Sequence, residues 1–165
     1  LTVSIYHPPM RVSAAICTWN RASLLDKTLS RMRTLWVPGH LEWELLVVNN
    51  NCSDDTVEVV QSHGDALPNR LLFEPVAGQC HARNRAIREA RGELLVWTDD
   101  DVLVSENWLD AYAQAAEQFP DARFFGGPIT PHFDTDPPRW VTNNMEVFGH
   151  PLVLRDFGNQ IRPLA

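Results

Sequence analysis

Five short strand-like runs alternate with segments of helical spacing along this chain, and this alternation limits the folds it can adopt. The runs lie at residues 12–17, 45–48, 70–74, 93–97 and 123–125. Between them, apolar residues recur at intervals of three and four positions, as in an amphipathic helix. Residues such as Pro38, Gly92 and Pro120 end these periodic segments. Strands that alternate with helices in this way predict an α/β fold with a mostly parallel sheet and helices on both faces.

The regular alternation stops near residue 131. Beyond it no clean period continues, and four prolines from Pro137 to Pro163 interrupt the chain. A chain of 165 residues buries about 70% of the surface that its unfolded form exposes, which is enough for one good core. We therefore predict one α/β domain over residues 1–130 and an irregular, proline-rich extension over residues 131–165.

The composition excludes several classes of ligand site. Lysine and arginine number 14 against 21 aspartates and glutamates, a formal charge of −7, which goes against nucleic-acid binding. The single lysine, Lys27, follows Asp26, so a Walker-type phosphate loop is excluded. No Gly-x-Gly is present, which removes the dinucleotide fingerprint. Three cysteines without a Cys-x-x-Cys pair favour a reducing compartment over a disulfide framework or a zinc site.

No run of 18 apolar residues occurs, so the sequence predicts no membrane span in this chain. The first residue is Leu1 rather than methionine, which indicates a processed, trimmed or excerpted chain.

Three adjacent aspartates, Asp99, Asp100 and Asp101, directly follow the apolar run at 93–97. In an open parallel sheet, ligands bind at the carboxyl ends of the strands, where this triplet is expected to lie. Adjacent carboxylates repel one another unless a cation compensates them. Oxygen ligands on alternate residues suit Mg²⁺ or Mn²⁺, so we predict a metal site at Asp99 and Asp101. The alternative is a solvated acidic loop that caps the next helix.

Three further residues can contact a nucleotide. Trp19 can stack on a base, although a lone tryptophan in a sequence more often packs against the protein itself. Asn50 can accept from and donate to a base edge, or belong to an ordinary turn. Arg83 follows Gly78 at a predicted helix start and can bind a phosphate with two hydrogen bonds, or be a plain surface arginine.

Four motifs in order carry a family resemblance. They are VSAAICTWNR, VVNNNCSDDT, GQCHARNRA, and TDDDV with NWL shortly after it. Together they resemble the family-two, inverting nucleotide-sugar glycosyltransferases with the GT-A fold, a Rossmann-like sheet. The resemblance runs from about residue 12 to about residue 131, and it makes residues 1–130 the nucleotide-sugar-binding domain.

The resemblance implies roles for individual residues. The expected nucleotide-binding residues are Thr18, Trp19, Asn20, Asn50, Arg83, Asp99 and Asp100, and the expected metal ligands are Asp99 and Asp101. Thr18 and Trp19 would lie against the nucleobase. Asn50 stands where the family usually has an aspartate that accepts from uracil, and its amide accepts a hydrogen bond without carrying a charge.

The implied reaction transfers a sugar from a nucleoside diphosphate sugar to a hydroxyl of a saccharide or lipid-linked acceptor. The expected donor is a UDP-sugar. The anomeric carbon is inverted, and Mg²⁺ or Mn²⁺ is the cofactor. The family's general base belongs to a later segment and is expected beyond Ala165. This chain is then the donor-binding portion, truncated on the acceptor side and inactive alone. The implied location is cytoplasmic, in solution or at the cytoplasmic face of a membrane.

Other interpretations remain at this point. A phosphohydrolase of the haloacid-dehalogenase type would use Asp99 as nucleophile and Asp101 as acid and base. That motif normally begins its domain, and it needs a basic residue downstream, whereas no lysine follows residue 27. A nucleotidyltransferase would normally show a glycine-rich basic loop after the first strand. A fragment that binds nucleotide without turnover is the non-enzymatic alternative.

Overall fold

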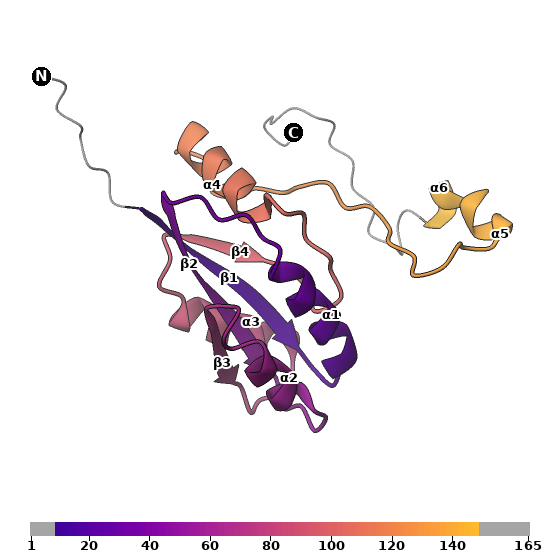
Figure 1. Ribbon diagram of the computed structural model, residues 1–165, viewed down its shortest axis with the longest axis horizontal. Coiled ribbons are helices and arrows are strands. Elements are labelled where there is room, and N and C mark those ends of the chain that lie inside the picture. The colour runs from indigo at the N-terminus through magenta and orange to yellow at the C-terminus, as the bar shows by residue number, and fades with distance from the viewer. Residues whose placement is uncertain (1–8, 149–165) are drawn as a thin grey trace, which may run out of the picture. The chain divides into compact units, whose positions relative to one another are not determined.

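Within residues 9–148, which the computed structural model describes, four parallel strands form one sheet. The strands are β1 (Met10–Thr18), β2 (Leu41–Asn49), β3 (Asn69–Phe73) and β4 (Leu94–Trp97). Their order in the sheet is β3-β2-β1-β4 (Figure 1). The chain therefore moves outward from β1 in one direction through β2 and β3, and then returns to place β4 on the other side of β1. This reversal makes the carboxyl end of β1 the topological switch point of the sheet.

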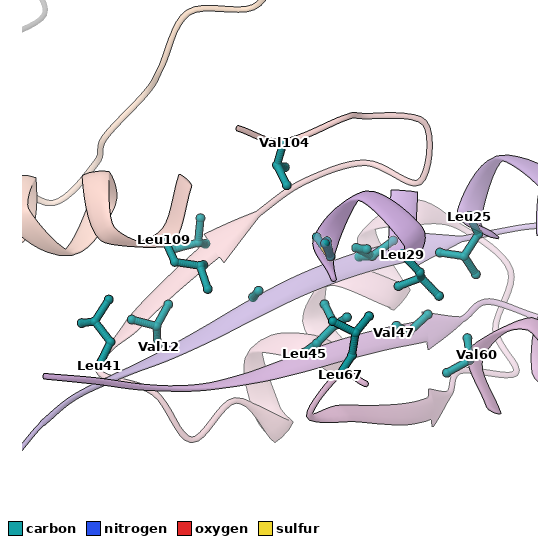
Figure 2. Packing of buried hydrophobic residues seen from close by; sticks show 14 of the residues in the cluster. Val12, Leu25, Leu29, Leu41, Leu45, Val47, Val60, Leu67, Val104 and Leu109 are labelled. Atoms are coloured by element: carbon teal, nitrogen blue, oxygen red, sulfur yellow. The ribbon is translucent and has the colours of Figure 1, made fainter. Parts of the chain in front are cut away.

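Helices cover both faces of this sheet, as the alternation predicted. The helices are α1 (Ala22–Met32), α2 (Thr56–Ser62), α3 (Gln79–Glu89) and α4 (Trp108–Gln118). On one face, α1, α2 and α4 bury side chains with the strands, and Figure 2 shows this packing. On the other face, α3 packs against β1 and β2 through Ala82 and Ala86. The α/β fold class is thus confirmed.

Strand β1 is buried on both faces, which explains its continuous apolar run. Ala14 and Ile16 belong to the cluster under α1, α2 and α4, whereas Ala15 belongs to the cluster under α3. A strand with helices on both sides has no solvent face, so its sequence does not alternate between polar and apolar residues.

The contacts of the chain divide it into two compact units, Leu1–Gln118 and Phe119–Ala165. In the described part of the second unit, α5 (Arg139–Thr142) and α6 (Met145–Phe148) are the helices. The predicted nucleotide-sugar-binding domain over residues 1–130 and the predicted extension toward the acceptor side over residues 131–165 stay predictions.

The strand predicted at residues 123–125 is wrong. The structure has no strand over these residues, and Phe124 is 87% exposed. A strand of three residues that ends directly before a glycine pair provides few ladder hydrogen bonds. An apolar run this short forms a strand only where a neighbouring strand and a buried face are available.

The entry into β4 requires a glycine. A Cβ atom at Gly92 would lie 2.4 Å from the Ser13 backbone nitrogen, 2.7 Å from the carbonyl carbon of Val12 and 2.8 Å from the carbonyl oxygen of Arg11. All three atoms belong to the central strand, which cannot move aside without disturbing the core. The Gly92 amide also donates to Ser13 Oγ at 2.8 Å. The close approach of two backbones thus fixes where β4 begins.

We expect Gly92→Ala to lower the free energy of unfolding by about 2–3 kcal/mol, because the added methyl meets backbone that cannot relax. The urea midpoint measures this change. Gly39→Ala is the matched control, since nothing lies within 4 Å of a Cβ there. The control should change stability by less than about 0.5 kcal/mol. Equal midpoints for both variants would contradict the close approach.

The N-terminus of α1 is capped from another loop. Asp54 Oδ2 accepts from the Ala22 amide at 2.9 Å, and Asp54 Oδ1 accepts from Thr56 Oγ1 at 2.6 Å. Burial acts to raise the pKa of Asp54, but these hydrogen bonds outweigh it and hold the pKa below its usual value. A carboxylate at this position satisfies a free helix amide and interacts favourably with the helix dipole.

We expect Asp54→Ala to cost about 1–2 kcal/mol of stability at pH 7, as for a lost helix cap. Because the folded pKa is lowered, this contribution is present above the ordinary carboxyl pKa and is lost as the pH falls through the folded value. Urea unfolding at pH 7 and pH 3 should therefore show the difference between wild type and variant shrinking in acid. Asp55→Ala, whose side chain makes no capping bond, is the control. A gap that stays constant between the two pH values would refute the cap.

Candidate functional site

Three loops leave the carboxyl ends of neighbouring strands at the switch point. Thr18 ends β1 and lies in register with Asn49, which ends β2, while Trp97 ends β4 on the other side of β1. The Thr98 amide continues the pairing by donating to the Ala15 carbonyl oxygen at 3.1 Å. The acidic triplet therefore starts from a fixed backbone position, beside the loop that follows β1.

The middle aspartate of the triplet points into the protein. Asp100 is 3% exposed, and its carboxylate accepts from Thr18 Oγ1 at 2.7 Å and from Arg21 Nη1 at 2.8 Å. Its carbonyl oxygen accepts from Thr28 Oγ1 in α1 at 2.9 Å. Burial raises the pKa of Asp100, and the Thr18 hydroxyl and the Arg21 charge only partly offset this effect. The Asp100 side chain thus anchors the loop in this structure, although the sequence predicted it to contact a nucleotide.

Asp99 and Asp101, on either side, are exposed. Asp101 Oδ2 accepts from Arg21 Nη2 at 2.8 Å. Among the described residues, no group of three or more histidine, cysteine, aspartate or glutamate side chains could hold a metal ion. Two carboxylates nevertheless fit Mg²⁺ or Mn²⁺ in a diphosphate complex, since such an ion takes one or two protein carboxylates and completes its shell with phosphate oxygens and water.

Arg83 lies over the indole of Trp97, with its Cζ atom 5.9 Å from the ring centroid. Burial is the main cause that raises the pKa of the Cys17 thiol to about 11; the charge of Arg83 lowers it, and those of Asp99 and Asp100 raise it further. These charges therefore lie around the end of β1. The structure therefore places Arg83, the predicted phosphate-binding residue of α3, against Trp97, which ends β4 directly before the loop that carries the acidic triplet.

Asn50 is used within the chain. Its Nδ2 donates to the Glu74 carbonyl oxygen at 3.1 Å and to the Val76 carbonyl oxygen at 2.7 Å, and its Oδ1 accepts from the Gly78 amide at 2.8 Å. Asn50 is 6% exposed. Both amide hydrogens are thus committed to the loop that leads into α3. Gly78 has a φ of +133°, a conformation that side chains rarely adopt, so this loop needs a glycine there.

The loop after β1 presents Trp19 at the surface, with 63% of the residue exposed. The next residue, Asn20, has a φ of +52°, and its Oδ1 accepts from the Ser53 amide at 2.7 Å. The Asn20 amide donates to Cys52 Sγ at 3.3 Å. Asn20 therefore joins the first two loops, while the Trp19 indole remains available for stacking.

Sequence reasoning missed Arg21, Thr28 and Arg31 as supports of the acidic loop. Arg31 Nε donates to the Val104 carbonyl oxygen at 2.8 Å, one turn along α1 from Thr28. The available signal was the spacing of Thr28 and Arg31, which places two polar side chains three positions apart on an amphipathic helix, one of them among its buried residues.

No helix within residues 9–148 is long and apolar enough to cross a membrane.

Curated relatives of the chain include a polysaccharide biosynthesis protein and a glucosyltransferase. It is 25% identical over 134 residues to the succinoglycan biosynthesis protein ExoM of Rhizobium meliloti, covering 80% of this chain and 43% of that protein. It is 32% identical over 111 residues to validoxylamine A glucosyltransferase of Streptomyces hygroscopicus, covering 66% and 26%. The chain thus spans less than half the length of these relatives.

Solved structures share the fold. TarS of S. aureus, in complex with UDP-GlcNAc, matches with a TM-score of 0.60 at 22% identity, covering 67% of this chain and 32% of that chain. The mannosyltransferase PcManGT of Pyrobaculum calidifontis, in complex with GDP-Man and Mn²⁺, matches with a TM-score of 0.59 at 29% identity, covering 67% and 33%.

The family model described as glycosyl transferase family 2 matches residues 13–162, which is most of the chain. This match goes against the phosphohydrolase and nucleotidyltransferase interpretations of the acidic triplet. The parallel sheet, the loops at its switch point and this match agree: the chain belongs to glycosyl transferase family 2 and has the GT-A fold.

Proposed function

We propose that this chain binds the donor of an inverting, metal-dependent glycosyltransferase, and that the donor is a UDP-sugar. The observation that carries the proposal is that the three aspartates of the triplet face different surroundings. Asp100 is locked inward by Thr18 and Arg21, which leaves Asp99 and Asp101 exposed at the switch point. Exposed carboxylates on a rigidly held loop are suited to hold a divalent cation against a diphosphate.

Arg83 and Trp19 complete the proposed donor site. The guanidinium of Arg83 can donate to phosphate oxygens, and its position over Trp97 limits the conformations it must give up on binding. Trp19 offers an exposed indole for the nucleobase. Asn50 acts by holding the loop before α3, and Thr18 and Asn20 act by fixing the loop that carries Trp19.

Known ligands of similar proteins support this class of donor. PcManGT, at 29% identity, is a mannosyltransferase in complex with GDP-Man and Mn²⁺. Guanosine is therefore the natural competitor of uridine in any test of base preference. ExoM, by its description a succinoglycan biosynthesis protein, supports a saccharide or lipid-linked acceptor. A cytoplasmic location belongs to the same proposal.

The proposed reaction breaks the bond between the anomeric carbon and the diphosphate oxygen. An acceptor hydroxyl oxygen attacks that carbon from the opposite face, the nucleoside diphosphate leaves with the bonding electron pair, and the hydroxyl proton passes to a general base. A bound divalent cation would neutralise charge that develops on the leaving diphosphate. Asp99 and Asp101 would hold that cation, and Arg83 would stabilise the same charge. No residue within 9–148 is proposed as the base.

We expect UDP to bind the chain in the presence of Mn²⁺ and to bind at least about tenfold more weakly in EDTA, a difference of about 1.4 kcal/mol. Isothermal titration calorimetry measures both, with GDP titrated in parallel. Asp99→Asn and Asp101→Asn should each reduce the affinity in Mn²⁺ to about the EDTA level, because each removes a negatively charged ligand.

Asp65→Asn, an exposed aspartate in the connection before β3, is the matched control and should bind UDP as the wild type does. UDP binding of equal strength in Mn²⁺ and in EDTA would overturn metal dependence. Tighter binding of GDP would replace uridine by guanosine and leave the rest of the proposal in place.

A further inference from the structure

Arg21 joins the buried and the exposed members of the acidic triplet with one guanidinium group. Nη1 donates to Asp100 Oδ1 and Nη2 donates to Asp101 Oδ2, each at 2.8 Å. The Asp100 side chain is 5% exposed, whereas those of Asp101 and Arg21 are 41% and 45% exposed. The carboxylate of Asp100 is therefore buried, whereas the carboxylate of Asp101 lies at the surface, where a cation can reach it.

The backbone of Arg21 is held in place before the ion pair forms. Its carbonyl oxygen accepts from the Leu24 and Leu25 amides, each at 3.0 Å, at the start of α1. The next amide, that of Ala22, is capped by Asp54. Two carboxylates outweigh the effect of burial and hold the pKa of Arg21 above its usual value. The positive charge is thus fixed beside Asp101 rather than carried on a freely moving surface side chain.

This charge is bonded to one carboxylate oxygen of a residue that belongs to the proposed metal site, Asp101. The triplet carries three negative charges when ionised, and Arg21 offsets one of them. A free divalent cation that binds Asp101 must share this carboxylate with Arg21 Nη2, or displace it, and must approach a guanidinium that Asp100 still holds through Nη1. Both effects weaken the binding of a bare cation, since like charges at close range repel. A cation that arrives with a diphosphate gains additional oxygen ligands that offset these costs.

We propose that Arg21 is a built-in counter-cation of the acidic triplet: it holds Asp101 in the nucleotide-free protein and suppresses the binding of free divalent cations, so that the cation enters together with the nucleotide. The inference rests on the proposed function for the role of Asp101. It assigns to Arg21 a control over the order of binding, beyond the support of the loop.

A purely structural role for Arg21 predicts the opposite effect. If the arginine only braced the loop, its removal would loosen Asp99 and Asp101 and weaken cation binding. A counter-cation, when removed, leaves the triplet more negative and frees Asp101 Oδ2, so cation binding becomes tighter. The direction of the change therefore separates the two roles.

The test measures binding of Mn²⁺ alone, without nucleotide, from the electron paramagnetic resonance signal of the free ion. We expect Arg21→Met to bind Mn²⁺ at least about tenfold more tightly than wild type, the effect of removing one positive charge beside the ligand. Arg21→Gln should also bind more tightly, and Arg21→Lys, which keeps the charge, should stay within about threefold of wild type. An unchanged or weaker affinity in both neutral variants would overturn the inference.

Two further variants isolate the charge. Thr28→Val removes the hydrogen bond from Thr28 Oγ1 to the Asp100 carbonyl oxygen without changing any charge, and should not tighten Mn²⁺ binding. Asp101→Asn in the Arg21→Gln background should abolish the gain. A gain in Thr28→Val equal to that of Arg21→Gln would also overturn the inference, because loosening alone would explain it. Urea unfolding of each variant shows that the measured protein is folded.

Failure of the inference and failure of the proposed function give different results. If wild type binds UDP or GDP only with Mn²⁺, but the neutral variants gain no affinity for Mn²⁺ alone, the inference is wrong and the metal-dependent donor site stands. If the affinity for nucleotide is the same with and without Mn²⁺, and Asp101→Asn changes neither nucleotide nor Mn²⁺ affinity in any background, the proposed function is wrong. The inference is then wrong as well.

Discussion

The buried carboxylate of Asp100 is the constraint on which the site depends. An ionised group with so little exposure is costly unless it is paired and hydrogen-bonded, and here Thr18 and Arg21 supply both requirements. Because Thr18 ends β1 and Arg21 begins α1, the carboxylate ties the acidic loop to the central strand and to the first helix at once. The neighbouring residues Asp99 and Asp101 are turned outward as a consequence.

The remaining loops are held by side chains that form hydrogen bonds with backbone groups. Asn50 holds the loop before α3, Asn20 holds the loop after β2, and Asp54 caps α1. Such bonds fix loop geometry without an extended apolar contact, which a loop at the surface cannot provide. A site built this way has most of its ordering complete before any ligand arrives.

The sequence predicts the sheet better than it predicts the site. The runs at 12–17 and 45–48 become strands because both faces are buried, a requirement that acts on every residue of the run. The run at 123–125 fails because its pairing depends on a neighbour that no local pattern reveals. Likewise, the acidic triplet can be recognised in the sequence because its three aspartates are consecutive. The inward orientation of the Asp100 side chain cannot, because it depends on Arg21, 79 positions away in the chain. The sequence predicts Asn50 as a nucleotide contact, but a polar turn does not reveal that the chain itself uses both hydrogens of this amide.

The placement of β4 beside β1 has a consequence for how the molecule folds. The first strand pairs with β2 after one short helix, but its pairing with β4 joins segments about 80 positions apart, as does the bond between Thr18 and Asp100. Closing a larger loop of chain costs more entropy, so the local β1-α1-β2 unit gains its contacts earlier. The switch-point site is then complete only when β4 docks beside β1. A partly folded chain without β4 in place would hold most of the described sheet and yet lack the acidic loop, so binding of the proposed ligand requires β4 to be paired with β1.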